Sequence, residues 1–266
     1  DMDVIILKDS AEVAEAAARI VRQLLQDKPN AVLGLASGNS PLATYRHLIE
    51  DCKQGLISFR DVTTFNLDEY IGLSAGDPQS YRHFMQRELF DHIDIDPGST
   101  FLPECGPGED PLAIGPAYEA LLRSRGGVDL QILGIGQNGH IGFNEPASSL
   151  RSRTRVKTLT RNTVAANSGY FDNAEQQPRT AITMGIGTIM DARHVLLLAT
   201  GASKAEAVRQ AIEGPVAAMC PASMLQMHQA ATVLLDSDAA AKLELRDYFQ
   251  WVAEQKSLLP GSQADA

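Results

Sequence analysis

The 266-residue sequence is poor in cysteine, and the few cysteines are badly placed for a structural framework. Cys52, Cys105 and Cys220 are odd in number, lie far apart and form no C-x-x-C pair. This pattern argues against a set of disulfide bonds and against a structural zinc site. We therefore expect three reduced and mostly buried thiols.

The sequence also lacks long apolar runs, and its first residues do not lead us to expect a secretory leader. No run approaches the roughly 18 consecutive apolar residues that identify a membrane-spanning helix. The first residues, DMDVIILKDSAEV, contain no basic region or cleavage signal. The composition, with 44% hydrophobic and 21% charged residues, is that of a globular protein. From the missing apolar run and signal we expect a cytoplasmic location.

Positive charge is scarce as well. The chain has 23 Lys and Arg residues against 33 Asp and Glu residues, which gives a net charge of -10. This charge repels phosphate backbones, and no face-wide basic cluster compensates for it, so nucleic acid is not an expected partner. One local basic stretch stands out, made of Arg151, Arg153, Arg155, Lys157 and Arg161. The exposed face of an alternating strand would explain it as well as a binding role would.

What the sequence does contain is a repeated alternation of short apolar strands and helices. Asp9 and Glu12 form a capping box before an amphipathic helix. Strands are predicted at residues 31–36, 62–67, 128–135, 194–200 and 232–236, and helices at 42–52, with Pro41 in first position, 204–214 and 239–255. The alternation predicts an α/β fold with a doubly wound, mostly parallel sheet and helices on both faces, Rossmann-like, in a single domain over residues 1–266. Residues 96–116 are expected to form a surface loop, and the polar, weakly patterned segment around 160–180 a mobile lid.

The stretch LGIGQNGHIGFNEP, residues 133–146, contains three glycines with the spacing of a dinucleotide-binding fingerprint. A nicotinamide site needs a helix directly after the glycines and an acidic residue about 20 positions further on. Gly142 and Pro146 interrupt that helix, and the later segment, SRTRVKTLT, is basic. We therefore expect no nicotinamide cofactor, and a thin-walled loop that lets His140 and Glu145 reach a small ligand.

Small polar residues follow two of the predicted strands. In open parallel sheets, ligands bind beyond the carboxyl ends of the strands. Backbone N–H groups and hydroxyls at helix starts form a phosphate cradle there, although the Walker A spacing is absent and ordinary helix caps have the same composition. The candidate residues are Ser37, Gly38, Asn39 and Ser40 after the first strand, and Gly201, Ala202, Ser203 and Lys204 after the fourth.

Acidic, amide and imidazole side chains follow the second and third predicted strands. Asp68 and Glu69 come after the second strand, and Asn138, His140 and Glu145 after the third. Two carboxylates and an imidazole beside a phosphate cradle suit proton transfer on a sugar phosphate. Taken singly, each has a simpler explanation as a helix cap, a loop histidine or a salt-bridge partner. A metal site is a weaker alternative because the spacing matches no usual ligand motif.

Five segments, in order, resemble the glucosamine-6-phosphate deaminase family, part of the glucosamine/galactosamine-6-phosphate isomerase group. They are SGNSPLATYRHL, FNLDEYIGL, GIGQNGHIGFNEPASSL, SRTRVKTLT and GASKAEA, and the resemblance runs from about Val4 to Phe249. It implies conversion of glucosamine 6-phosphate to fructose 6-phosphate and ammonia, a step of amino-sugar catabolism classed with the hydrolases, and it implies no metal or other cofactor.

The resemblance also implies residue roles. Asp68 would move a proton from C2 to C1, and His140 would open the sugar ring with Glu145 as its partner and Asn138, often an aspartate in relatives, orienting it. Ser37, Gly38, Asn39, Ser40 and Lys204 would bind the phosphate. Gly169 stands where relatives, which have ANSRFF for ANSGYF here, carry a phosphate-clamping arginine.

An allosteric site is implied as well. Ser148, Arg155, Lys157, Thr158 and Tyr248 match positions that bind N-acetylglucosamine 6-phosphate between subunits of allosteric relatives, which implies a homo-oligomer, possibly a hexamer. The chain departs from those relatives at residues 220–223, where they usually have W-T-x-S.

Three alternatives stay open. A galactosamine-6-phosphate deaminase or isomerase is the nearest, since Gly169 weakens the assignment of the substrate. A 6-phosphogluconolactonase shares the fold but lacks the glutamate of FNEP. A catalytically inactive sugar-phosphate sensor would need a DNA-reading module, for which the chain has no spare segment.

Overall fold

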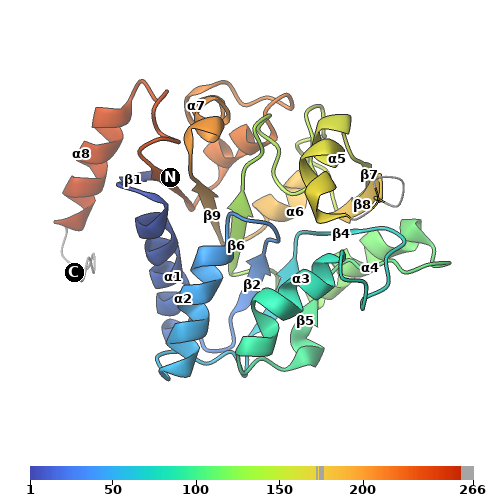
Figure 1. The fold of residues 1–266 in the computed structure, drawn as a ribbon. Coiled ribbons are helices and arrows are strands. Elements are labelled where there is room, and N and C mark those ends of the chain that lie inside the picture. The colour runs from blue at the N-terminus through green and yellow to red at the C-terminus, as the bar shows by residue number, and fades with distance from the viewer. Residues whose placement is uncertain (172, 174–176, 259–266) are drawn as a thin grey trace.

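The computed structural model describes residues 1–171, 173 and 177–258 and is built on a seven-stranded parallel sheet (Figure 1). The strand order is β1-β10-β9-β6-β2-β3-β5, and every neighbouring pair is parallel. The strands are β1 (Met2–Leu7), β2 (Val32–Leu35), β3 (Thr63–Asn66), β5 (Thr100–Phe101), β6 (Leu130–Gly134), β9 (His194–Ala199) and β10 (Ala231–Asp236). All five predicted strands are confirmed, and the edge strands β1 and β5 were not predicted.

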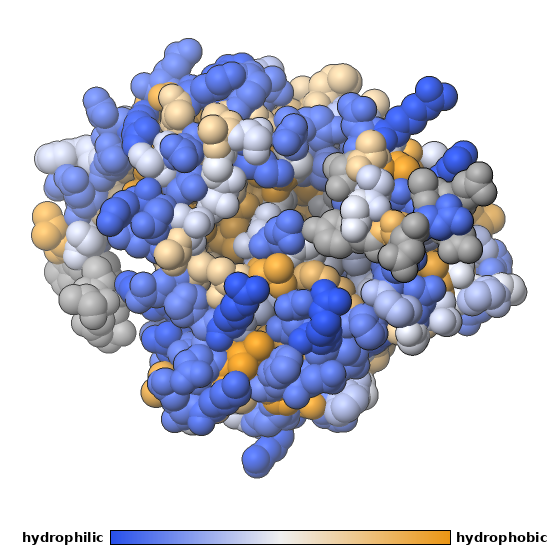
Figure 2. Space-filling model, viewed as in Figure 1, coloured by the Kyte–Doolittle hydropathy of each residue, from blue (hydrophilic) through white to orange (hydrophobic). Residues whose placement is uncertain are grey.

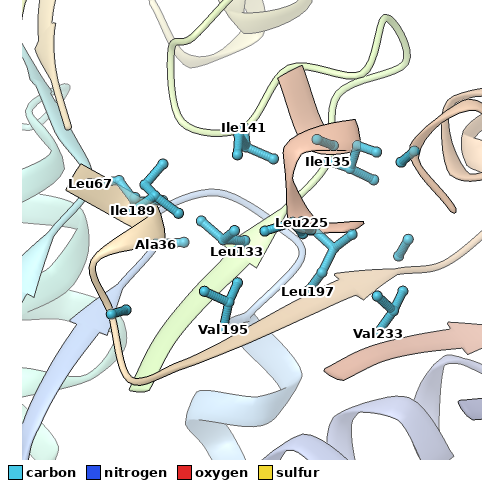
Figure 3. Close-up of a cluster of buried hydrophobic side chains, with 14 of the residues drawn as sticks. Ala36, Leu67, Leu133, Ile135, Ile141, Ile189, Val195, Leu197, Leu225 and Val233 are labelled. Carbon is cyan, nitrogen blue, oxygen red and sulfur yellow. The ribbon is translucent and has the colours of Figure 1, made fainter. Parts of the chain in front are cut away.

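Helices cover both faces of this sheet, which confirms the doubly wound architecture. One face packs against α1 (Ser10–Asp27), α2 (Leu42–Lys53) and α3 (Tyr81–Glu88). The other packs against α4 (Pro111–Ser124), α6 (Ile186–Met190), α7 (Ala205–Glu213) and the 3-10 segment Pro221–Met227. Figure 3 shows part of this second core, where Leu133 of β6, Val195 and Leu197 of β9 and Val233 of β10 lie near Ile189 of α6 and Leu225.

The helix starts follow the predicted capping chemistry with small shifts. The Asp9 carboxylate accepts a hydrogen bond from the Glu12 N–H at 3.0 Å, so Asp9 is the N-cap of α1. Pro41 lies one position earlier than expected and is the N-cap of α2. Further short 3-10 turns are Phe90–His92, Pro97–Ser99, Ser168–Tyr170 and Ala202–Lys204.

A second, antiparallel sheet was not predicted. It has the order β4-β8-β7, with β4 (Asp68–Tyr70), β8 (Thr180–Thr183) and β7 (Arg155–Thr158). Asp68 therefore begins a strand, which excludes its alternative explanation as a helix cap. Helix α5 (Arg161–Asn167) follows β7 and lies within the segment expected to form a lid.

Two predicted boundaries are wrong. The last helix, α8 (Arg246–Ser257), begins at Arg246 and not at residue 239. The reason is a competing acceptor, since the Glu213 carboxylate takes the N–H groups of Glu244 and Leu245 and residues 237–245 form turns. The segment 96–116 is not a plain loop either, because it contains β5 and the first turns of α4, with Pro116 inside the helix.

The three cysteines are free. Cys105 and Cys220 are buried, and Cys52 is partly exposed. No helix among the described residues is long and apolar enough to cross a membrane.

Candidate active site

One large cavity lies at the carboxyl ends of the strands of the main sheet. Its volume is about 1040 Å³, which is ample for a sugar phosphate with bound water. Figure 2 shows the molecule hollowed near the centre of this face, with apolar surface in the hollow and hydrophilic side chains around it. The predicted residues that line the cavity are Ser37, Gly38, Asn39, Ser40, Asp68, Asn138, His140 and Lys204.

The glycine-rich loop after β6 is shaped by close packing around the catalytic candidates. A Cβ atom at Gly136 would lie 2.1 Å from Cε1 of His140. Gly142 has a φ of +56°, and a Cβ there would lie 3.5 Å from a carboxylate oxygen of Asp68. No helix follows β6 before β7, so the structure agrees with the predicted thin-walled loop and not with a dinucleotide fingerprint.

His140, Asn138 and Glu145 form one hydrogen-bonded group. The Nδ1 atom of His140 lies 2.6 Å from Oδ1 of Asn138 and 3.4 Å from Oε2 of Glu145. The Asn138 amide donates to the same Glu145 oxygen at 2.9 Å, so the amide bridges the imidazole and the carboxylate. These contacts on Nδ1 leave Nε2 without a hydrogen-bond partner among the described residues, on a ring that lines the cavity.

Glu145 lies behind this group and is buried, with 3% of its surface exposed. Burial opposes its ionisation, but hydrogen bonds from His140, Thr163 and Asn138 outweigh that effect and lower the pKa of Glu145 to about 2. The carboxylate is therefore charged at neutral pH. It does not line the cavity, so it acts on a ligand through His140.

Asp68 has the opposite environment. Its carboxyl group is buried against the cavity wall and accepts no hydrogen bond from the described residues. Burial, with a smaller contribution from the charge of Glu69, raises the pKa of Asp68 to about 8. A carboxyl whose pKa is shifted towards neutrality and that faces a cavity is suited to proton transfer.

Glu69, the neighbour of Asp68 in the sequence, supports the fold and does not face the cavity. It is not part of the cavity wall, and its carboxylate accepts the N–H groups of Tyr70, Tyr81 and Arg82. Two of these donors belong to the first turn of α3, whose free N–H groups need acceptors. Burial dominates these hydrogen bonds and raises the pKa of Glu69 to about 7.

The phosphate-binding candidates line the same cavity. Lys204 is half-buried there, its Nζ atom donates to the carbonyl of Ile135 at 2.6 Å, and burial lowers its pKa. Among the described residues, the Lys and Arg side chains that line the cavity are Lys204 and Arg87. Arg87, on α3, was not singled out from the sequence, because nothing in the pattern of α3 indicates that its helix borders the site.

Gly169 lies in the 3-10 turn Ser168–Tyr170, at the end of α5. It is exposed and does not line the cavity. A Cβ atom there would meet nothing within 4 Å, so packing does not require glycine at this position.

The residues of the expected allosteric site do not come together within one chain. Arg155 donates to Asn144 at 2.8 Å, Lys157 is half-buried, Thr158 is exposed, and the buried Ser148 hydroxyl lacks a partner among the described residues. Tyr248 lies on α8, at the opposite end of the molecule from β7 (Figure 1). Elsewhere in the basic stretch, Arg153 bonds the carboxylates of Glu119 and Asp191, so it stabilises the fold.

A metal centre has no support in the side-chain arrangement. Among the residues that the structure describes, no three His, Cys, Asp or Glu side chains are placed to hold an ion.

The comparisons with known proteins concern the family and the fold. Residues 8–234 match the family model described as glucosamine-6-phosphate isomerases/6-phosphogluconolactonase. The chain is 58% identical over 259 residues to a glucosamine-6-phosphate deaminase of Hahella chejuensis, which covers 97% of this chain and 98% of that protein. The solved structure of a monomeric glucosamine-6-phosphate deaminase superposes with a TM-score of 0.87 at 47% identity, covering 90% of this chain and 99% of that one. A 6-phosphogluconolactonase from Trypanosoma brucei, 20% identical with a TM-score of 0.74 over 91% of this chain and 99% of its own, has the same fold.

Proposed function

Because the chain belongs to the family of glucosamine-6-phosphate isomerases and 6-phosphogluconolactonases, we propose that it converts glucosamine 6-phosphate to fructose 6-phosphate and ammonia. The observation that carries this proposal is the single cavity wall that contains Asp68, His140 and the phosphate-binding loops. The names of the similar proteins support a deaminase, and they do not support the expected class label of hydrolase.

His140 opens the sugar ring in this proposal. Its Nε2 atom moves a proton between the C1 hydroxyl and the ring oxygen, which produces the open-chain aldehyde. The Asn138 amide and the Glu145 carboxylate both lie at Nδ1, so they fix the orientation of the imidazole and leave Nε2 directed to the transfer.

Asp68 then acts at carbon. Its carboxylate takes the proton from C2 while the ammonium nitrogen loses a proton and the C1 carbonyl oxygen gains one, which gives an enamine with a hydroxyl at C1. The protonated Asp68 then returns its proton to C1. The product is a ketose imine at C2, and addition of water at C2 followed by loss of ammonia gives the ketose. One base next to two adjacent carbons suffices, because the proton leaves and returns on one face.

The raised pKa of Asp68, about 8 in the empty cavity, fits a base that is activated by its substrate. An ammonium group on C2 would stabilise the carboxylate next to it and lower that pKa. The base therefore ionises when the amino sugar is bound, and a sugar phosphate without the amine lacks this activation.

The test is an ammonia-release assay with glucosamine 6-phosphate. Asp68→Asn should lower kcat by about 10² to 10⁴-fold, the usual range for loss of a general base. Asp91→Asn, which changes an exposed aspartate on the 3-10 turn Phe90–His92, is the control and should retain the wild-type rate. Undiminished turnover by Asp68→Asn would disprove the assigned role.

The same assay distinguishes the alternative substrates. The galacto epimer is tested in parallel, and 6-phosphogluconolactone is tested for hydrolysis. Addition of EDTA reports on metal dependence, which the proposal does not expect. Turnover of the lactone alone would reject the deaminase and identify the other activity of the family.

We further propose that Ser148, Arg155, Lys157 and Thr158 form part of a binding site for a phosphorylated effector. The support is a buried hydroxyl at Ser148 without a partner among the described residues, together with two cations, Arg155 and Lys157, whose pKa burial lowers and neither of which forms an ion pair within the described residues. Tyr248 could complete the site only from a second copy of the chain. The effector site therefore requires an oligomer, whereas one similar solved structure is of a monomeric deaminase.

The segment around 160–180 remains proposed as a lid. Its helix α5 contributes Asn162, Thr163 and Asn167 to the cavity wall, so its movement would change access to the site. Residues 172 and 174–176 of this segment lie outside the described residues.

A further inference from the structure

Helix α5 contacts the carboxylate that supports the catalytic histidine. The Thr163 hydroxyl donates to Oε1 of Glu145, and the Thr160 hydroxyl lies 3.4 Å from the same oxygen. Thr160 and Thr163 both lie at the start of the lid segment, whereas Glu145 belongs to the loop after β6. The lid and the acid/base group are thus joined by side-chain hydrogen bonds.

The two oxygens of Glu145 have separate partners. Oε2 receives the amide of Asn138 and lies near His140, while Oε1 receives hydroxyls of the lid segment. Among the described residues, these hydroxyls are the side-chain donors to Oε1. Without them, a buried carboxylate would lose a hydrogen-bond partner and the contact that fixes its rotation about the side chain.

The same threonines also fix where α5 begins. Thr160 is the N-cap, and its hydroxyl accepts from the Thr163 N–H at 3.2 Å and lies 3.0 Å from the Thr163 hydroxyl. Thr163 is buried, with 6% of its surface exposed. The first turn of the helix therefore cannot move away without breaking its contact with Glu145.

The other end of α5 is attached to the strand that carries Asp68. The Asn167 amide donates to the Tyr70 hydroxyl at 3.1 Å, and the hydroxyls of Tyr70 and Tyr81 lie 3.3 Å apart. Tyr70 is the last residue of β4, which begins with Asp68. When α5 is docked, it therefore connects Glu145, the partner of His140, with the strand that carries Asp68.

We propose that Thr163 is a positioning residue for ring opening: its hydroxyl holds Glu145, and through it His140, in the productive arrangement only while helix α5 is docked. This inference rests on the proposed deaminase activity and adds to it a coupling between lid position and acid/base chemistry. Since the Thr163 hydroxyl contacts Glu145 and no candidate phosphate-binding residue, the coupling acts on kcat more than on KM.

The test compares Thr163→Val, which removes the hydroxyl and keeps the branched shape, with Thr163→Ser, which keeps the hydroxyl. We expect Thr163→Val to lower kcat by about 10-fold or more with KM within about 3-fold, and Thr163→Ser to stay near wild type. Ser168→Ala is the matched control, because it removes an exposed hydroxyl near the same helix that bonds only Ala165 among the described residues. Thr163→Ala replaces Thr163→Val if that variant does not fold by circular dichroism.

A second measurement does not depend on turnover. Carboxyl carbon NMR follows the ionisation of Glu145, whose pKa should rise in Thr163→Val and not in Thr163→Ser, because a donor to the charged form is lost. Unchanged kcat and an unchanged Glu145 titration in Thr163→Val would overturn the inference. Failure of the wild-type protein to release ammonia would instead reject the deaminase activity, and the titration would still report on the contact.

Discussion

Gly136 illustrates how single atoms determine the site. The His140 ring occupies the space that a side chain at residue 136 would fill, with ring atoms at 2.1 to 2.5 Å from the position of a Cβ. A methyl group there must displace the ring, and that displacement disturbs the contact of Nδ1 with Asn138. The glycine therefore serves the histidine and not a cofactor phosphate.

We predict that Gly136→Ala lowers kcat by about 10²-fold, because a displacement of about 1 Å of a catalytic group has effects of that size. The measurement is kcat in the ammonia-release assay together with a thermal unfolding curve. Gly76→Ala is the control, since a Cβ at Gly76 meets nothing within 4 Å. Equal turnover numbers for the two variants would show that the ring adapts without loss.

Gly169 leads to a prediction in the opposite direction. A new arginine at this exposed, unhindered position could reach towards the substrate phosphate from the end of α5. A charge-assisted hydrogen bond is worth about 1.5 to 3 kcal/mol, so Gly169→Arg should lower KM for glucosamine 6-phosphate by about one to two decades. An unchanged KM would indicate that another cation, for which Arg87 is the candidate in the cavity wall, already fills this role.

At the scale of elements, strand β7 and helix α8 are the pair to test for regulation. They lie at opposite ends of one molecule (Figure 1), so an effector can contact both only across an interface between copies. We predict that N-acetylglucosamine 6-phosphate changes the dependence of initial rate on substrate, and that Lys157→Ala and Tyr248→Ala both remove this effect. Light scattering on the same samples gives the subunit count, and identical hyperbolic curves with and without effector would reject the site.

The elements also show what the sequence could and could not predict. The buried parallel strands were found because they are short apolar runs bounded by loops, and the residues after them converge because parallel strands end at one edge. The sheet β4-β8-β7 was missed because its strands have only three or four residues, and because β4 pairs with β8 from a distant part of the sequence. The helix predicted at 239–255 begins only at Arg246, because Glu213 accepts the N–H groups of Glu244 and Leu245 through contacts that no local signal reveals.

Within the site, the sequence predicted which residues take part better than it predicted their hydrogen-bond partners. Asp68 and Glu69 are adjacent and alike, yet alternate directions along β4 place one in the cavity wall and the other under α3. Thr163 carries no motif, and its contact with Glu145 arises only when α5 docks on the loop after β6. Contacts of this kind depend on tertiary packing.

For the whole molecule, the buried carboxyls predict how stability depends on pH. Burial raises the pKa of Asp68 to about 8 and of Glu69 to about 7, whereas both groups ionise near pH 4 in the unfolded chain. Between these values the folded state binds more protons, so the free energy of unfolding falls as pH rises through about 4 to 8. Glu145 acts oppositely, because its pKa of about 2 gives a contribution that is lost only as pH falls below about 4.5.

We therefore predict that the free energy of unfolding of Asp68→Asn is higher than that of wild type at pH 8. The difference between the two proteins should be larger at pH 8 than at pH 5 by more than about 1 kcal/mol. Urea unfolding of the empty protein at the two pH values measures both differences. Asp91→Asn, on the surface, should show no such change. A gap between Asp68→Asn and wild type that is the same at both pH values would contradict the raised pKa.

The strand order leaves β1 without its partner strand during synthesis of the chain. β1 lies at the edge of the main sheet and pairs with β10, whose residues come more than 220 positions later. At a synthesis rate of about 5 to 20 residues per second, roughly 10 to 50 s pass between the synthesis of β1 and that of its partner β10. During that time the apolar residues and open backbone edge of β1 stay available to chaperones or to other nascent chains.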